Sequence, residues 1–157
     1  MVMIVSYDEI ISCFLSKITD PDFLTYSEEV INELMIDWLH SSASNPYIRV
    51  LYSSLKFNDF ERNVYCELKY SSDDEIDAIF VQDIIARCMV IAWLEPKVKS
   101  TSNIHQMFSG KEAKFYAQST HLKEIKDLLE TEKSELRKII RDYGYINNSY
   151  LKGGTVK

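Results

Sequence analysis

Apolar residues recur every three or four positions in two early stretches of the chain, the spacing of an amphipathic helix. Ser6 to Glu9 has the pattern of a capping box at the start of the first stretch, which Asp20-Pro21 ends. Thr25 to Glu28 has the same pattern before the second stretch, which should end in the polar connector 41–46. The sequence therefore predicts two helices before residue 46.

The period then changes from helical spacing to strict alternation. Val64, Cys66, Leu68 and Tyr70 alternate with polar or amphipathic residues, which predicts a half-buried strand. Leu55 and Phe57 could belong to a partner strand joined through Asn58-Asp59. We expect one β-hairpin near residues 55–70. Because a lone hairpin is marginal in water, it must lie against the helices or against another subunit.

The most apolar helix should follow the hairpin. Ser72 to Glu75 resembles a third capping box, and the apolar positions from Asp73 to about Leu94 cover nearly the whole circumference. A helix that is apolar on all sides is a central helix. Pro96 should end it, and the polar composition of residues 97–117 predicts an irregular connection.

A last helix, from about Ser119 to Tyr143, has a heptad-like apolar seam interrupted once, by Glu132. The seam either packs against the other helices or is shared with a second subunit. A lone buried carboxylate is costly, so Glu132 should meet solvent or a cation. Gly144 is the expected C-cap. The seam consists of Leu122, Ile125, Leu129, Glu132, Leu136, Ile139 and Tyr143.

Residues 144–157 are too polar to fold alone and form either a frayed terminus or an extended docking tail. Tyr145, Ile146, Tyr150 and Leu151 are the tail residues that could contact a partner. The predicted architecture is mainly α: a single domain over residues 1–143, a bundle of about four helices with one β-hairpin inserted between the second and third long helices.

The charge of the chain narrows the classes of partner. With 24 acidic and 18 basic residues the formal charge is −6, which opposes a nucleic-acid grip but would let DNA pass without sticking. The three cysteines are widely spaced and indicate buried thiols in a reducing compartment. The apolar start, Met1 to Val5, is too short for a signal or membrane segment, so we expect a soluble protein with no membrane contact.

The sequence contains no motif typical of a catalytic site. His40, His105 and His121 lie in no metal-ligand spacing, and Cys66 and Cys88 lie on apolar faces, where thiols are usually inert. The acidic clusters stand at helix N-termini, where the macrodipole favours them. No phosphate-loop or nucleophile motif is present. We therefore expect no enzyme, no cofactor and no metal.

The order of segments resembles a family of virion proteins. Residues 91–97 (IAWLEPK), 102–104 (SNI) and 114–117 (KFYA) precede a long charged helix that ends in residues 139–145 (IIRDYGY). This arrangement resembles the head–tail connector or adaptor proteins beneath the portal of tailed bacteriophages. The chain departs from the expected pattern at residues 117–119, where a proline would usually start the last helix.

The resemblance implies a structural protein of the virion neck, assembled in the host cytoplasm as a ring, typically twelve-fold, that continues the DNA channel. Its partners would be the portal protein, which the tail enters, and the next neck or tail protein. A stopper, a tail terminator and a non-viral regulatory interaction module are the alternatives. The hairpin and the last helix would contact neighbouring subunits, with Phe57, Phe60, Tyr65 and Glu132 as the interface candidates.

Overall fold

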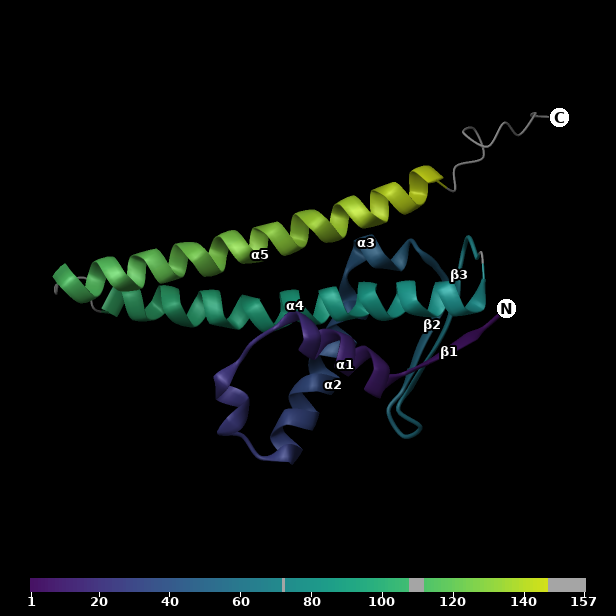
Figure 1. Cartoon of the computed structure of the whole chain (residues 1–157), viewed down its shortest axis with the longest axis horizontal. Coiled ribbons are helices and arrows are strands. Elements are labelled where there is room, and N and C mark those ends of the chain that lie inside the picture. The colour runs from purple at the N-terminus through teal and green to yellow at the C-terminus, as the bar shows by residue number, and fades with distance from the viewer. Residues whose placement is uncertain (72, 108–111, 147–157) are drawn as a thin grey trace.

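The fold is mainly helical with one small antiparallel sheet, as predicted (Figure 1). The structure is a computed structural model that describes residues 1–71, 73–107 and 112–146. Four long helices and one short one account for most of these residues. The elements are β1 (Met3–Ser6), α1 (Tyr7–Lys17), the 3₁₀ helix η1 (Pro21–Leu24), α2 (Glu28–Ser44), α3 (Pro46–Arg49), β2 (Tyr52–Asn58), β3 (Asn63–Leu68), α4 (Asp74–Met107) and α5 (Glu112–Ile146).

The predicted hairpin is present as β2 and β3, between the second and third long helices, and it gains a third strand that the sequence did not predict. The strand order is β1-β3-β2, with Met3 opposite Cys66 and Val5 opposite Val64. Met3 and Val5 are buried while Ile4 between them is exposed, which is the alternation of a strand. β1 lies at one edge of the sheet. The sequence did not predict it because only four residues pair, too few for their alternation to be recognised.

Helix α4 is the centre of the molecule, as its all-round apolar composition predicted. Helices α1, α2 and α5 all pack on it, and α5 runs back along its length (Figure 1). The sheet contributes the buried Val64 and Cys66 to the same core. Burial of apolar surface between α4 and its neighbours is the main stabilising contribution. The largest fully buried side chains are Tyr7, Phe14, Ile10, Leu39, Ile48, Ile84, Ile85, Met89, Leu94, Leu136, Val5 and Val64.

The helix starts follow the predicted capping boxes in part. At α1 the backbone N–H of Glu9 donates to Ser6 Oγ (3.2 Å) and the N–H of Ser6 donates to Glu9 Oε2 (3.3 Å), so this box is confirmed. The predicted box at Thr25 is wrong, because η1 occupies the preceding residues and Ser27 caps α2 instead. In the third box Ser72 lies outside the described residues, and Asp73 accepts the N–H of Glu75 (2.9 Å).

The prediction that Pro96 ends the central helix is wrong, since α4 continues to Met107. Proline inside a helix costs about 3 kcal/mol through the lost N–H and its ring. Packing on both sides offsets this cost: Leu94 is buried, Val98 packs on the core, and Lys133 of α5 pairs with Glu95 (3.3 Å). The expected irregular connection 97–117 is therefore helical over residues 97–107 and 112–117.

The predicted end of the last helix is also wrong. Helix α5 starts at Glu112 and passes through Gly144 to Ile146, so Gly144 is a helical residue and not a C-cap. Packing of Tyr143 against the core extends the helix past the glycine. Tyr145 and Ile146, predicted to lie in an extended tail, belong to the last turn of α5. Tyr150 and Leu151 lie outside the described residues.

The seam of α5 packs inside the molecule, against α4. Leu122, Leu129 and Leu136 are buried along it. Glu132, the one charge in the seam, is half-buried, and its Oε2 lies 3.8 Å from the Arg87 guanidinium of α4. Arg87 of the same chain thus supplies the cation expected beside Glu132. A role of Glu132 in a contact between subunits stays a prediction.

Candidate interaction surfaces

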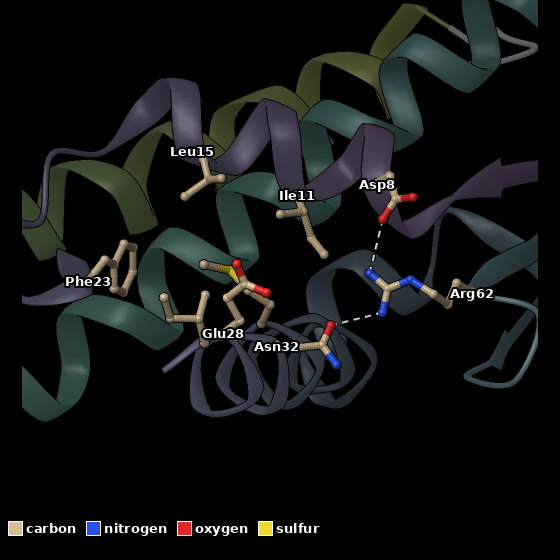
Figure 2. Close-up of a pocket in the computed structure, with 9 residues that line it drawn as sticks. Asp8, Ile11, Leu15, Phe23, Glu28, Asn32 and Arg62 are labelled. Atoms are coloured by element: carbon tan, nitrogen blue, oxygen red, sulfur yellow. Dashed lines mark hydrogen bonds and ion pairs between the residues drawn. The ribbon is translucent and has the colours of Figure 1, made fainter. Parts of the chain in front are cut away.

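A groove with apolar walls lies between α1 and α2. Its volume is about 360 Å³. Ile11 and Leu15 line it from α1, Ile31 and Met35 from α2, and Phe23 of η1 closes one end (Figure 2). These positions face the groove because residues three and four apart share one side of a helix. We call this hollow the α1–α2 groove.

Arg62 closes the other end of the α1–α2 groove. It comes from the turn between β2 and β3, and its guanidinium donates to Asp8 of α1 (3.0 Å) and Asn32 of α2 (2.9 Å), as Figure 2 shows. Its backbone has a φ of 54°, a left-handed conformation that is costly for a residue with a side chain. The two hydrogen bonds and the bond from Tyr7 N–H to the Arg62 carbonyl (2.8 Å) hold this conformation in place.

The 3₁₀ helix is fastened to α4 by a buried carboxylate. The side chain of Asp20 is 4% exposed and accepts hydrogen bonds from Trp93 Nε1 (2.7 Å) and Lys97 Nζ (3.0 Å). Burial alone raises the pKa of Asp20, but the bonds from Trp93 and Lys97 outweigh it and the pKa lies below its usual value. A second hollow of about 290 Å³ lies beside this contact, on the other side of Phe23.

A polar cluster fixes the base of the hairpin turn. Asp59 Oδ1 accepts a hydrogen bond from the Tyr7 hydroxyl (2.6 Å) and lies 2.7 Å from His40 Nε2. The His40 ring stacks on Phe57, with ring centroids 5.1 Å apart. Hydrogen bonds from Tyr7, and then from His40, lower the pKa of Asp59. The hairpin is therefore tied to both α1 and α2 by ionised Asp59.

The tip of the hairpin presents an aromatic side chain to solvent. Phe60 is 98% exposed, between the tied residues Asp59 and Arg62. Next to it the Tyr65 hydroxyl donates to Glu61, which stiffens the turn from the sheet side. The turn therefore holds an apolar side chain in solvent, where another protein could bury it.

The last described turns of α5 meet the start of α4 in an aromatic cluster. The Tyr143 ring stacks on Phe80, with centroids 5.0 Å apart, and its hydroxyl donates to the Tyr70 carbonyl. Ile76 lies one helical turn before Phe80 and is 63% exposed, and Tyr145 is exposed nearby on the last turn of α5. Exposed apolar side chains therefore lie close to the point where the chain leaves α5.

Two of the three cysteines, Cys66 and Cys88, are buried in the core. Burial raises the pKa of Cys66 to about 11 and that of Cys88 to about 12, so both thiols stay protonated at neutral pH. Among the described residues no group of three histidine, cysteine or acidic side chains could hold a metal ion. None of the helices in the described ranges is long and apolar enough to cross a membrane. The polar clusters that are present bind one element of the fold to another.

The structure brings three of the predicted interface residues together. Phe57, Phe60 and Tyr65 share the hairpin, where Phe57 and Tyr65 are half-buried and Phe60 is exposed. Glu132 belongs to the contact between α4 and α5, away from the hairpin. The sequence did not reveal Arg62 or Asp59, because their partners lie far along the chain. The α1–α2 groove was not predicted either, because its walls are the ordinary apolar faces of two amphipathic helices.

Comparison with known proteins does not extend these observations. No family model matches the chain, and neither the curated proteins nor the solved structures contain a match. The function of the chain is therefore inferred from its surfaces and its sequence.

Proposed function

We propose that the chain is a non-enzymatic assembly protein, a structural adaptor in the neck of a tailed bacteriophage. The observation that carries the assembly role is Phe60, a fully exposed aromatic side chain on a turn braced by Asp59 and Arg62. A braced turn loses little conformational entropy on binding, which favours a contact with another protein. The station in the phage neck is supported by the resemblance of residues 91–145 to connector proteins.

In this proposal two surfaces of the chain contact different partners. The hairpin tip contacts the neighbouring subunit of a ring, typically twelve-fold, and the end of α5 with residues 147–157 contacts the portal. The hairpin tip and the end of α5 each combine an exposed apolar side chain, Phe60 or Tyr145, with a backbone that hydrogen bonds and packing hold in place. The formal charge of −6 lets DNA pass through the ring without binding it.

The experiment is binding to portal rings encoded in the same genome, measured by co-sedimentation and mass photometry. Deletion of residues 147–157 should leave the far-ultraviolet circular dichroism of the domain unchanged, because α5 ends at Ile146, and should abolish attachment to the portal. Portal binding that survives this deletion would remove the tail from the proposal.

The hairpin has its own test. Phe60→Ser should prevent ring formation on the portal, whereas Val50→Ser, an exposed apolar residue outside the hairpin, should not. If both variants assemble as well as the wild type, the hairpin is not the contact between subunits. A stable dimer in native mass spectrometry, formed without a portal, would favour a regulatory interaction module. A stopper or tail terminator would bind an assembled neck or tail but not an isolated portal ring.

A further inference from the structure

The second hollow, beside the contact between Asp20 and α4, has walls of aromatic side chains. Its volume is about 290 Å³, and it is lined from η1 and the loop after it, from α2 and from α4. Tyr26 of its wall is 45% exposed, and Trp38 and Trp93 are half-buried, so part of the aromatic wall faces solvent. We call this site the aromatic hollow. Its apolar lining residues are Phe23, Tyr26, Leu34, Trp38, Trp93 and Pro96.

The charged side chains of the aromatic hollow are already paired. Lys97 Nζ lies 3.0 Å from Asp20 Oδ2 and 5.0 Å from the centroid of the Trp93 ring. The indole N–H of Trp93 donates to the same carboxylate (2.7 Å). Because these groups bind one another, an occupant gains little by offering them a charge or a hydrogen bond. The hollow therefore suits an uncharged side chain, and its rings favour a further aromatic ring in tilted or offset contact.

Phe60 has the chemistry and the size that the aromatic hollow requires. An apolar cavity of roughly 150 Å³ is large enough to bind benzene, so the hollow has room for the phenyl ring and for part of the turn beside it. Phe60 is the most exposed aromatic side chain among the described residues. Its turn is held by Asp59 and Arg62, so little conformational entropy is lost when the ring is buried.

Phe60 and the aromatic hollow lie on opposite sides of the molecule. Leu34 and Trp38 line the hollow from α2, whereas Asn32 and His40 of the same helix bind the hairpin turn. Two positions along an α-helix are about 200° apart around its axis, so the hollow and the turn face away from each other. Figure 1 shows η1 and the hairpin turn on either side of α1 and α2. Phe60 can therefore reach the aromatic hollow of another chain but not its own.

We propose that the aromatic hollow receives Phe60 from the hairpin tip of a second copy of this chain. Since the two surfaces lie on opposite faces, each copy gives its Phe60 to one neighbour and receives the Phe60 of the other. Such a head-to-tail contact produces a ring where the rotation closes and a filament where it does not. This pairing rests on the proposed function, in which Phe60 contacts a neighbouring subunit, and it names the surface of that neighbour.

The α1–α2 groove is the rival site for the same side chain. Arg62, two residues after Phe60, lines this groove, so the groove and the hairpin tip lie on the same side of the molecule. Insertion of Phe60 there would be reciprocal between two copies and would produce a two-fold dimer instead of a ring. The location of the contact on the neighbouring copy distinguishes the two sites.

Photocrosslinking of the full chain locates that contact. A variant with p-benzoylphenylalanine in place of Phe60 is assembled on portal rings as an equal mixture of ¹⁵N-labelled and unlabelled copies, so that crosslinks between copies carry both isotopes. We expect mixed crosslinks to residues 93–100 of α4, which line the aromatic hollow but not the groove. Mixed crosslinks to residues 8–15 of α1 instead, or assembled rings without any to residues 93–100, would overturn the pairing.

These outcomes separate the pairing from the function on which it rests. Rings that form on the portal without a crosslink to the aromatic hollow refute only the choice of receptor. If the unmodified chain does not assemble on portal rings at all, the proposed function fails, and the pairing fails with it.

A tyrosine pair tests the wall of the aromatic hollow. Tyr26→Ser should raise about five-fold or more the chain concentration at which half of the portal rings carry a complete ring of subunits, because ring-on-ring contact is lost. Tyr47→Ser on α3 is the matched control and should change this concentration less than two-fold. The two tyrosines are 45% and 52% exposed. Equal effects in mass photometry would exclude the hollow.

A double-mutant cycle tests whether Tyr26 and Phe60 touch across the contact. Phe60→Leu keeps an apolar side chain but removes the ring, and it should raise the same concentration about three-fold or more. The double variant Tyr26→Ser, Phe60→Leu should cost clearly less than the product of the two single effects, because both substitutions remove the same contact. Effects that multiply would show independent sites and would overturn the pairing.

Discussion

The core around α4, to which α1 and α2 belong, and the lobe formed by η1 and the loops beside it (residues 18–27) are held together in different ways. In the core, side chains such as Ile84 and Leu136 are fully buried and uncharged. In the lobe, apolar side chains such as Leu24 stay exposed, and Asp20 attaches the lobe to α4 through Trp93 and Lys97. Folding stability therefore resides mainly in the core, while the lobe keeps apolar surface exposed.

The largest expected effect is a difference in the free energy of unfolding between one substitution in the core and one in the lobe. Ile84→Ala should lower the free energy of unfolding by about 2–5 kcal/mol, because Ile84 is fully buried and its loss leaves a cavity. Leu24→Ala should change it by less than about 0.5 kcal/mol, since Leu24 is 90% exposed. Urea denaturation of the two variants measures the difference. Equal losses would show that the lobe contributes to stability as the core does.

The next effect concerns the tie between η1 and α4. Asp20→Asn should lower the free energy of unfolding by about 1.5–3 kcal/mol at pH 7, because Trp93 and Lys97 lose a charged acceptor. Asp37→Asn, at an exposed carboxylate of α2, is the control and should have little effect.

The pH dependence of the same tie follows from the lowered pKa of Asp20. Since the pKa is lower in the folded than in the unfolded chain, the stabilisation is complete above the ordinary value of 3.8 and is lost as the pH falls through the folded value. The stability difference between wild type and Asp20→Asn should therefore shrink below about pH 4. A difference that persists unchanged at pH 2 would contradict the assignment.

A smaller effect is expected at Tyr52 in the core. The hydroxyl of Tyr52 is buried and has no hydrogen-bond partner among the described residues. Removing a buried unsatisfied group relieves its desolvation cost, so Tyr52→Phe should raise the free energy of unfolding by about 1 kcal/mol. Thermal unfolding followed by circular dichroism measures this change. A loss of stability would mean that the hydroxyl has a partner, such as a bound water, in solution.

The smallest effect lies at the end of α5. A Cβ on Gly144 would meet nothing within 4 Å, and the residue is helical. Gly144→Ala should therefore stabilise the protein by about 0.5–1 kcal/mol through the lower entropy of the unfolded chain. If Gly144 ended the helix in a left-handed conformation, as the sequence suggested, the same substitution would destabilise the protein. Urea denaturation distinguishes the two signs.

Local sequence patterns predicted the helices and strands that depend mainly on residues close in the sequence. The Ser6–Glu9 box, the alternation over 64–68 and the apolar circumference of α4 each depend on neighbours a few positions apart. Pro96 and Gly144 were misleading for the same reason. Their usual effect as helix breakers is a local rule, and packing of α4 against α5 overrides it.

The interaction surfaces depend on contacts that are distant in the sequence. Arg62 closes the α1–α2 groove by binding Asp8, 54 positions away, and Tyr7 reaches Asp59 across 52 positions. No periodic pattern encodes such pairs. Phe60 was found because it lies in a turn, whereas its exposure and the bracing of that turn required the tertiary structure.

The most direct test of the assembly role is an electron cryo-microscopy structure of the chain bound to portal rings. We expect a ring in which Phe60 is buried against the neighbouring subunit and Tyr145 lies at the contact with the portal. A complex in which both side chains remain exposed to solvent, as they are in the isolated chain, would contradict it.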